Sequence, residues 1–377
     1  MTTTNTDVVI IGGGVVGIAT AYYLGRAGVK SVVIERDAIG SHASGFAYGE
    51  LSPLGGAGIP GPLYPLAEEG MRLHRQLSTI LPQETGVATQ YRLHPALNLV
   101  FTEEERELEK SHLAWRQQQK GYQVRWLDRS EARSVEPRVS EEILGAVYIE
   151  GMAEVDPYRF VLALTQAAEK GGATIRHGKV IGLKRDVERV RGVVLESGQV
   201  ECDRVVVAMG PWSGETSPWL GVPIHVRPLK GQILRLNAPG PPVQCSVAWG
   251  HHYATTKLDG LLWAGTTEEE VGFDENPTER GRATVMDALL KMMPVFADAQ
   301  LVRQTACLRP LSSDWLPILG PVPGYEGVYV ATGAGRKGIL VGPAMGRIMA
   351  DLMVRGATDI PAEAFGVARF SEQRPSG

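Results

Sequence analysis

The sequence is poor in cysteine and has no surplus of positive charge, and each shortage excludes a class of protein. Its three cysteines, Cys202, Cys245 and Cys307, form no CxxC pair. The sequence therefore predicts neither a disulfide framework nor a metal site, and such cysteine use is typical of a reducing compartment. Acidic residues (42) outnumber lysine and arginine (38), giving a net charge of −4. Because a nucleic-acid-binding protein normally carries a basic surplus or stripe, no nucleic-acid partner is expected.

A long, uninterrupted apolar run is also missing. The most apolar stretch is broken by Gly12, Gly13, Gly14 and Gly17, which favours a buried strand, turn and helix over a membrane span. The first residues, MTTTNTD, have neither the positive start nor the apolar centre of a signal peptide. We therefore expect a soluble, cytoplasmic protein without a transmembrane segment.

The N-terminal region predicts a parallel β-sheet. Apolar runs at 7–11 and 31–35 read as strands and 15–27 reads as a helix, which together make a βαβ unit. From residue 172 onwards short strands predict a β-meander that returns to this sheet. Residues 223–273 alternate apolar and polar side chains, which indicates antiparallel strands in a second domain. Further helices are expected over 66–81, over 102–120 with a Thr cap, after Asp156 as N-cap with Pro157 at the first position, and within NPTERGRATVMDALLKMMP.

The segment GGGVVG supplies a dinucleotide-binding turn between the first strand and the first helix. Gly12 allows a tight turn, Gly14 lets the backbone approach a pyrophosphate, and Gly17 lets helix and strand pack closely. Glu35 ends the second strand, where its carboxylate can accept hydrogen bonds from a ribose. The motif in this context predicts dinucleotide binding, although a plain packing turn would use the same glycines.

A second glycine turn, VYVATGAGRKGILVGPAMG, lies near the C-terminus, and a third strand, VVVAMGPWS, ends at Gly210. In this order the three segments resemble those of the FAD-dependent amino-acid oxidase family, which includes glycine oxidase, D-amino-acid oxidase and dehydrogenase, and sarcosine oxidase. SHASGFAYGELSP, RPLKGQIL and CLRPLSSDWLPILG match further family segments, and the last of them is most similar to glycine oxidase. The matching pieces are spread over nearly the whole chain.

This resemblance implies an α/β protein with a discontinuous, Rossmann-like FAD-binding domain and an inserted α+β substrate domain built on an antiparallel sheet. The FAD-binding domain is expected at 1–88, 152–222 and 309–377, and the substrate domain at 89–151 and 223–308. The second glycine turn would then aim backbone N–H groups at the flavin, where negative charge collects on reduction.

By the same resemblance, Ser41 and Ser44 would line the path from adenosine to flavin, and Val180 would contact the adenine through its backbone. Ordinary loop capping is the alternative for both serines. The full set of expected cofactor residues is Gly12, Gly14, Val15, Val16, Gly17, Glu35, Arg36, Ser41, His42, Ser44, Gly45, Gly49, Leu51, Val180, Ala208, Gly210, Trp212, Gly335, Arg336, Lys337, Gly338 and Ile339.

At the substrate end, Arg309 matches the family's carboxylate-binding arginine and Tyr253 the tyrosine that covers the same site. An arginine suits this role because its planar fork makes two parallel hydrogen bonds to a carboxylate. A structural ion pair for Arg309 and a sheet-face position for Tyr253 are the alternatives. Arg336 is also assigned to catalysis, and Lys337 is in line with a carboxylate-binding lysine of sarcosine oxidase. Both could instead neutralise the reduced flavin or face solvent.

The adjacent His251 and His252 are candidates for a base, but neighbours on one strand point to opposite faces, so at most one should face the flavin. The family's hydride transfer from a neutral amine requires no base. His42 could lie by the flavin or only hold its loop.

Cys307 aligns with the cysteine that links FAD covalently in sarcosine oxidase, and a buried free thiol is the alternative. The strand GLLWAGTT lacks the oxygen-activating lysine of sarcosine oxidase. Oxygen and another redox carrier therefore both remain open as electron acceptors.

The sequence thus predicts oxidation of a small amino acid or secondary amine, of the glycine, sarcosine or D-amino-acid type, to the imine, which water hydrolyses to the oxo acid. Three rivals are a flavin dehydrogenase of a 2-hydroxy acid or glycerophosphate, a flavin-carrying subunit of a larger complex, and an NAD enzyme. Substrate chirality, the acceptor and the oligomeric state, including a homo-oligomer or a redox partner subunit, are left open.

Overall fold

The computed structural model describes residues 5–370, and its N-terminal part forms the expected βαβ unit. Strand β1 (Asn5–Ile11) leads through the first glycine turn into helix α1 (Val15–Arg26) and then into β2 (Ser31–Glu35). β1 pairs in parallel with β2 on one side and with β12 (Gly198–Val207) on the other. Val8, Val9 and Ile10 are fully buried, as expected for a parallel strand covered on both faces.

Eight strands make up this first sheet, in the order β10-β11-β12-β1-β2-β9, with β19 beside β12 and β18 beside β19. The strands not yet given are β9 (Thr174–His177), β10 (Val180–Asp186), β11 (Arg189–Leu195), β18 (Ile318–Pro321) and β19 (Val328–Thr332). β10, β11 and β12 form the predicted meander, and β12 returns in parallel to β1.

Helices cover one face of this sheet and enclose the largest core. These are α1, α3 (Leu63–Thr85), α6 (Pro157–Lys170) and α9 (Gly338–Arg355). The predicted cap of α6 is confirmed, because the Asp156 carboxylate accepts a hydrogen bond from the Arg159 N–H at 2.9 Å. α3 begins earlier than predicted, because Pro65 falls in its first turn, where the missing N–H costs nothing.

A second sheet of eight strands has the order β17-β13-β16-β15-β14-β5-β7-β6 and carries a further large core. Its strands are β5 (Ala96–Val100), β6 (Gln123–Leu127), β7 (Gly145–Glu150), β13 (Val226–Asn237), β14 (Ser246–Trp249), β15 (His252–Thr256), β16 (Leu262–Gly265) and β17 (Gln300–Ser312). All its pairings are antiparallel except that of β5 with β14. α4 (Glu103–Gln117), α5 (Arg129–Val135) and α8 (Glu279–Met292) pack around it.

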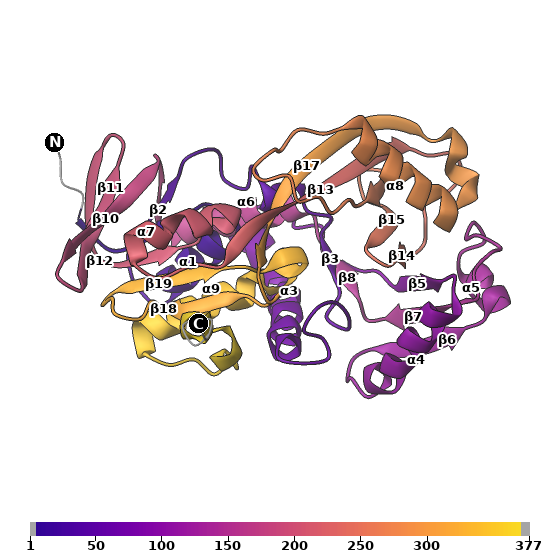
Figure 1. Ribbon diagram of the computed structural model, residues 1–377, viewed down its shortest axis with the longest axis horizontal. Coiled ribbons are helices and arrows are strands. Elements are labelled where there is room, and N and C mark those ends of the chain that lie inside the picture. Colours follow the sequence, from indigo (N-terminus) through magenta and orange to yellow (C-terminus); the bar gives the residue numbers. More distant parts are fainter. Residues whose placement is uncertain (1–4, 371–377) are drawn as a thin grey trace, which may run out of the picture.

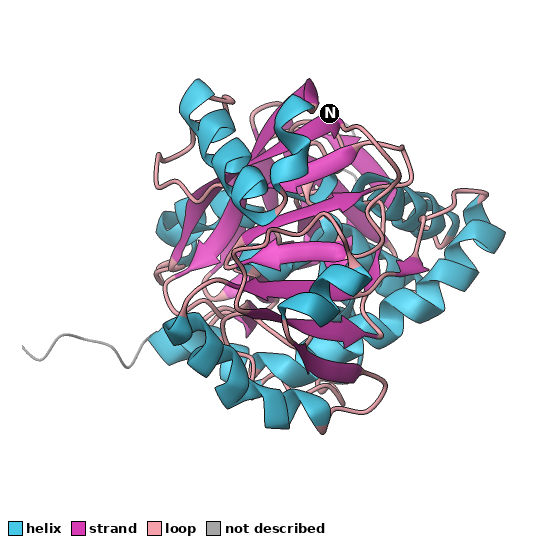
Figure 2. Cartoon of the chain, turned by 90° about the vertical axis from the view of Figure 1, so that its right-hand side faces the viewer, coloured by secondary structure: helices cyan, strands magenta, loops and turns pink. Residues whose placement is uncertain are grey.

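The two large sheets lie side by side along the long axis of the molecule (Figure 1). Between them lies a small sheet of β3 (Glu50–Leu51), β4 (Arg92–Leu93) and β8 (Ala153–Glu154). Seen from the end that carries the second sheet, helices surround the strands (Figure 2). The predicted domain boundary at residue 308 falls inside β17, which pairs with β13 along its length.

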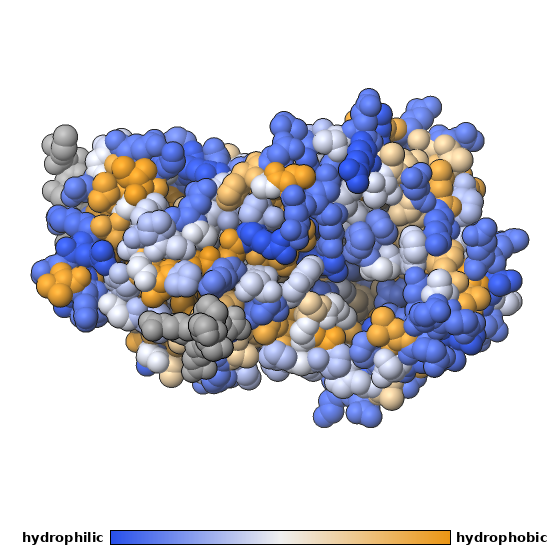
Figure 3. Space-filling view, in the orientation of Figure 1, coloured by the Kyte–Doolittle hydropathy of each residue, from blue (hydrophilic) through white to orange (hydrophobic). Residues whose placement is uncertain are grey.

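The short helix α2 (Ala43–Phe46) and a 3-10 turn at Gly210–Thr216 contact the second sheet, and the short helix α7 (Ser217–Leu220) follows that turn. Among the described residues, no helix has both the length and the apolar character needed to cross a membrane. The face shown in Figure 3 is largely hydrophilic, with apolar residues in separate small groups.

Candidate active site

A cavity of about 680 Å³ runs between the two large sheets and gathers nearly all of the predicted site residues. All of them line it except Gly17, Gly45 and Leu51. A side chain at Gly17 would meet the Gly12 carbonyl oxygen at 2.0 Å, and one at Gly45 would meet the Gly40 carbonyl oxygen at 2.1 Å. Leu51 is fully buried in the core. These three residues therefore support the cavity wall from behind.

The first glycine turn places main chain, not side chains, against the cavity. Gly12 has a φ of +112°, and a Cβ there would lie 2.3 Å from the Ala208 carbonyl oxygen. The N–H of Gly13 donates to the Glu35 carboxylate at 2.6 Å, and the N–H of Val15 donates to the Ser44 hydroxyl at 3.0 Å. Only glycine permits this approach of turn and strand.

The residues at this end of the cavity fit a dinucleotide. Glu35 also accepts a hydrogen bond from the Asp37 N–H at 2.8 Å, yet a carboxylate has about four acceptor positions, so a ribose can still donate to it. The Ser41 hydroxyl lines the cavity, is buried, and has no hydrogen-bond partner among residues 5–370. A buried hydroxyl of this kind calls for a polar group in the cavity.

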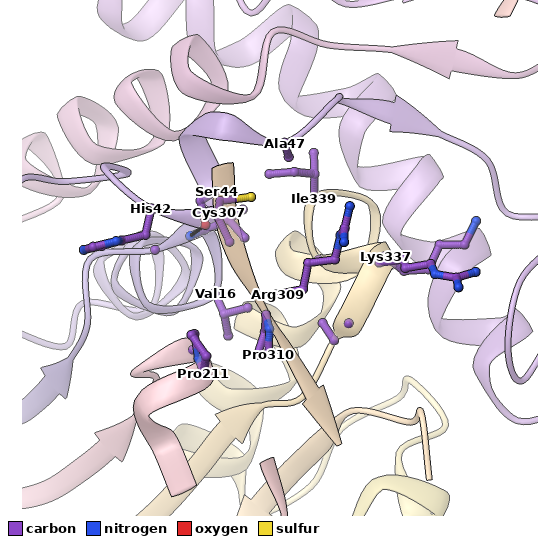
Figure 4. A pocket seen from close by; sticks show the side chains of 18 of the residues that line it. Val16, His42, Ser44, Ala47, Pro211, Cys307, Arg309, Pro310, Lys337 and Ile339 are labelled. Carbon is purple, nitrogen blue, oxygen red and sulfur yellow. Dashed lines mark hydrogen bonds between the residues drawn. The ribbon is translucent and has the colours of Figure 1, made fainter. Parts of the chain in front are cut away.

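The second glycine turn forms the opposite wall. A 3-10 turn at Gly335–Lys337 leads into α9, whose first residues Gly338, Ile339 and Leu340 line the cavity. Figure 4 shows Ile339 and Ala47 on one side of the cavity and Val16 and Pro211 on the other. The positive end of the α9 dipole therefore faces the space between the two glycine turns.

Arg309, predicted to bind the substrate carboxylate, lines the cavity from β17 and is oriented by the second sheet. Its Nη2 donates to the Thr266 hydroxyl at 2.7 Å and its Nη1 to the Thr267 carbonyl oxygen at 3.3 Å. The guanidinium lies flat over Gly231, where a Cβ would come within 2.3 Å of both terminal nitrogens. Among the described residues Arg309 makes no ion pair, so the structural ion pair considered from the sequence is not formed and its charge is free for an anion.

Tyr253 lies beside Arg309 and lines the same cavity. Its ring stacks on Tyr48, with centroids 3.8 Å apart, and lies over Gly265, where a Cβ would meet the phenol oxygen at 2.5 Å. Burial raises the pKa of Tyr253, so the phenol stays protonated and able to donate a hydrogen bond.

Arg336 and Lys337 take different positions. Arg336 is exposed and makes two hydrogen bonds to the Glu268 carboxylate, of 2.5 and 2.6 Å. The Lys337 Nζ donates to the carbonyl oxygen and to the hydroxyl of Ser52, at 2.7 and 2.9 Å. Burial lowers the pKa of Lys337 to about 8. Both residues line the cavity, and Arg336 already has a counter-ion.

The prediction that His251 and His252 point to opposite faces is wrong, because β15 begins only at His252 and His251 belongs to the preceding turn. Both rings line the cavity, with centroids 4.1 Å apart. Burial lowers the pKa of both histidines, that of His252 to about 4. Each is therefore neutral near pH 7.

His42 and Cys307 also reach the cavity wall. The two ring nitrogens of His42 contact Asp37 at 2.8 Å and Glu275 at 3.0 Å. Cys307 is 5% exposed, and burial raises the pKa of its thiol. A protonated thiol is a poor nucleophile, which disfavours the covalent link to FAD considered from the sequence.

Several lining residues were missed by the sequence analysis. Tyr48, Glu50 and Ser52 face the cavity while Leu51 faces the core, which is the period-2 alternation of a strand. Glu50 has neither an ion pair nor a side-chain hydrogen bond within residues 5–370. The segment YGELS carries this alternation, but its surroundings could not be placed from the sequence. Arg116, from α4, is a further charged lining residue.

Comparison with known proteins gave consistent matches. Residues 7–352 match the family described as FAD dependent oxidoreductase. The chain is 32% identical to glycine oxidase of Geobacillus kaustophilus, over 98% of this chain and 97% of that protein. It is 29% identical to the hydrogen cyanide synthase subunit HcnC of Pseudomonas aeruginosa, with 97% of each chain covered. The crystal structure of the Geobacillus glycine oxidase superposes with a TM-score of 0.92 at 30% identity, covering 97% of this chain and 99% of that one.

Proposed function

The chain belongs to the family of FAD-dependent oxidoreductases and is an amino-acid oxidase or dehydrogenase that acts on a CH–NH or CH–NH2 group, and from this premise we propose that it oxidises a small amino acid or secondary amine of the glycine, sarcosine or D-amino-acid type. The product would be the imine, which water hydrolyses to the oxo acid. FAD, when bound, supplies the acceptor for the hydride that leaves the substrate Cα.

The observation that carries the proposal is the free guanidinium of Arg309. Its hydrogen bonds to Thr266 and Thr267 and its position over Gly231 fix the plane of the fork. A planar fork with an uncompensated charge is the group that binds a carboxylate through two parallel hydrogen bonds. Arg309 would hold the substrate carboxylate, and this orients the Cα–H towards the space between the glycine turns.

Tyr253 would complete the carboxylate site. Because its phenol stays protonated, it can donate a further hydrogen bond to the carboxylate held by Arg309. The stack with Tyr48 fixes the ring and keeps water from this side of the site. The neutral His251 and His252 add no charge near pH 7 and thus do not compete with Arg309 for the carboxylate.

The N-terminus of α9 would stabilise negative charge that develops on the far side of the cavity during the reaction. Its first residues line the cavity, and the N–H groups of a first helical turn have no partner within the helix. Preorganised donors of this kind stabilise such charge without reorganisation. Lys337 lies in the same turn and could add to this field, whereas the charge of Arg336 is already balanced by Glu268.

An anaerobic absorbance titration tests the proposal. The panel holds glycine, sarcosine, D- and L-alanine, D- and L-proline, and a 2-hydroxy acid, each added to the FAD-loaded protein. Bleaching of the flavin by an amino acid, lost in an Arg309→Ala variant that still holds FAD, is the expected result. Bleaching by the 2-hydroxy acid alone would replace the amine by an alcohol as the substrate. Readmitting air then tells oxygen from another acceptor.

A second candidate function is that of a flavin-carrying subunit in a larger complex. The similarity to a subunit of hydrogen cyanide synthase favours it. This function predicts FAD that no member of the panel bleaches, together with co-purification of a larger assembly. The same titration therefore separates the two candidates.

A further inference from the structure

Residues 271–276, here called the strap, leave the second sheet after β16 and touch the FAD-binding half of the molecule. The strap is anchored to its own sheet at Asp274, whose carboxylate accepts a hydrogen bond from the Lys230 Nζ at 2.8 Å. The Lys230 side chain is 1% exposed, so this end of the strap is fixed. The Asn276 backbone N–H and side-chain amide also donate to Asp274, at 3.1 and 2.7 Å.

Phe273 makes the first contact of the strap with the other half of the molecule. Its ring stacks on Trp212, with centroids 5.7 Å apart and the planes inclined by 20°. The Arg36 guanidinium lies 4.0 Å from the centre of the same indole. Trp212 and Arg36 both line the cavity at the end that holds Glu35. Phe273 itself is 45% exposed, so neither core packing nor the substrate end accounts for its position.

Glu275 makes the second contact, through His42. The His42 Nδ1 lies 3.0 Å from the Glu275 carboxylate, and its Nε2 lies 2.8 Å from the Asp37 carboxylate. Ionised carboxylates only accept hydrogen bonds, so both contacts form together only when both ring nitrogens carry a proton. His42 is therefore a cationic bridge between the strap and the wall of the cavity. The His42 ring also meets the edge of Trp212, with centroids 4.8 Å apart, and this joins the two contacts.

We propose that the strap retains FAD, by holding the cavity wall at Trp212 and His42 closed through Phe273 and Glu275. Neither strap residue lines the cavity, so both act as positioning residues through the wall. The inference rests on FAD binding and not on the choice of substrate. If no compound of the substrate panel bleaches the flavin, this inference is therefore not affected. If the strap variants release FAD at the wild-type rate, the proposed function is not affected.

The bridge gives FAD retention a defined dependence on pH. The charged groups that face His42 are Asp37 on its own side, Glu275 from the strap, and Arg36, whose Nε donates to Asp37 at 3.0 Å. Although burial lowers the pKa of His42, the hydrogen bonds to the two carboxylates outweigh it and raise the pKa above 6.5. The bridge is thus complete at low pH and is lost as pH rises through the raised pKa, when one carboxylate faces an unprotonated nitrogen.

Two strap variants and a matched control test this inference. Phe273→Ala removes the stack and should raise the rate of FAD dissociation roughly fivefold at every pH. Glu275→Gln should make the rate of FAD dissociation independent of pH. An amide can donate a hydrogen bond to the unprotonated His42 Nδ1 and can also accept one from the protonated His42 Nδ1. Val271→Ala is the control, since Val271 is as exposed as Phe273 and makes no ring contact.

The measurement is the recovery of free-FAD fluorescence after dilution of the holoenzyme, between pH 6 and pH 9. The wild type and Val271→Ala should release FAD faster as pH rises. Equal rates of FAD release for Phe273→Ala and Val271→Ala, or a wild-type rate that does not depend on pH, would overturn the inference.

If FAD stays bound throughout, hydrogen exchange of the 271–276 amides in the holoenzyme replaces this readout. Faster exchange in Phe273→Ala than in the wild type is then expected, and equal exchange overturns the inference.

Discussion

The Glu35 end and the Arg309 end of the cavity are built on different principles. At the Glu35 end the cavity wall is mostly main chain. Glycines there let the turn approach the strand until their backbone atoms are in contact, as at Gly12 and Ala208. At the Arg309 end, side chains from separate strands meet, and glycines serve as flat surfaces beneath them. Gly265 lies directly opposite Tyr253 in the pairing of β15 with β16. Gly231 lies diagonally opposite Arg309, because Leu229 is the direct partner of Arg309.

We propose that this difference separates cofactor binding from substrate binding. A change in the glycine turns should abolish FAD binding. A change beneath Arg309 should leave FAD bound but weaken binding of the substrate carboxylate. Four substitutions test that separation.

Gly12→Ala should have the largest effect. The new Cβ would meet the Ala208 carbonyl oxygen at 2.3 Å with φ at +112°, so we expect a loss of about 3 kcal/mol or more in the free energy of unfolding and no bound FAD. Gly28→Ala is the matched control, because φ is +77° but nothing lies within 4 Å. It should cost about 1 kcal/mol and keep FAD. Denaturant unfolding and the flavin absorbance of the purified variants provide the check, and a yellow Gly12→Ala protein would contradict the account.

Gly231→Ala should break only the substrate end. Its Cβ would push the Arg309 guanidinium out of its plane, and misplacement on that scale reduces kcat/KM by about 10²-fold. FAD content should equal that of the wild type. Gly182→Ala, on β10, serves as control because its Cβ would meet nothing within 4 Å. Steady-state kinetics on the substrate found in the titration decide the matter, and an unchanged KM would show that Arg309 does not hold the carboxylate.

Lys337→Met tests the turn that lies between the two ends. Because the folded-state pKa of Lys337 is lowered to about 8, the folded protein binds fewer protons than the unfolded chain between pH 8 and 10.5. Deprotonation of Lys337 therefore raises the free energy of unfolding of the wild type by about 2 kcal/mol as pH rises across this interval. The variant has no such increase, because Met does not titrate. The difference in free energy of unfolding between the two apoproteins should accordingly shift in favour of the wild type from pH 7 to pH 10. A difference independent of pH would mean that burial does not shift this pKa.

Glu268→Gln should have the smallest effect. The variant weakens the pair with Arg336, whose side chain is 40% exposed, and exposed pairs contribute about 1 kcal/mol or less. We expect a stability change below this value and a KM within about threefold of the wild type. A tenfold fall in KM would instead show that Glu268 competes with the substrate carboxylate for Arg336.

The fold class, the FAD cofactor and the family were predictable from the sequence, and all three are confirmed. The Glu35 end was accessible from the sequence because its parts are local: Gly12, Gly14 and Glu35 lie within one βαβ unit whose geometry is fixed by the chain itself. Short-range patterns such as the Thr102 and Asp156 caps were predicted correctly for the same reason.

The Arg309 end was accessible only in part. Gly231 and Gly265 meet Arg309 and Tyr253 through strand register, and a register shift of one residue would turn each side chain to the other face. Tyr48 reaches Tyr253 from the loop before β3. No local pattern encodes such pairings. The error at His251 has the same origin, because the start of β15 depends on its partner strands. The bidentate pair of Arg336 with Glu268 was likewise invisible, since the two residues come from different halves of the molecule.

The most direct measurement is a titration of the FAD-loaded protein with a carboxylate that has no oxidisable amine, such as acetate, followed through the flavin absorbance. The wild type should show a saturable spectral shift, and an Arg309→Lys variant with the same FAD content should show none, because the ammonium keeps the charge but loses the planar fork. Equal titration curves for the two proteins would contradict the account, since the carboxylate would then bind without Arg309. A variant that loses its FAD would contradict it as well, because the two ends of the cavity would not be separable.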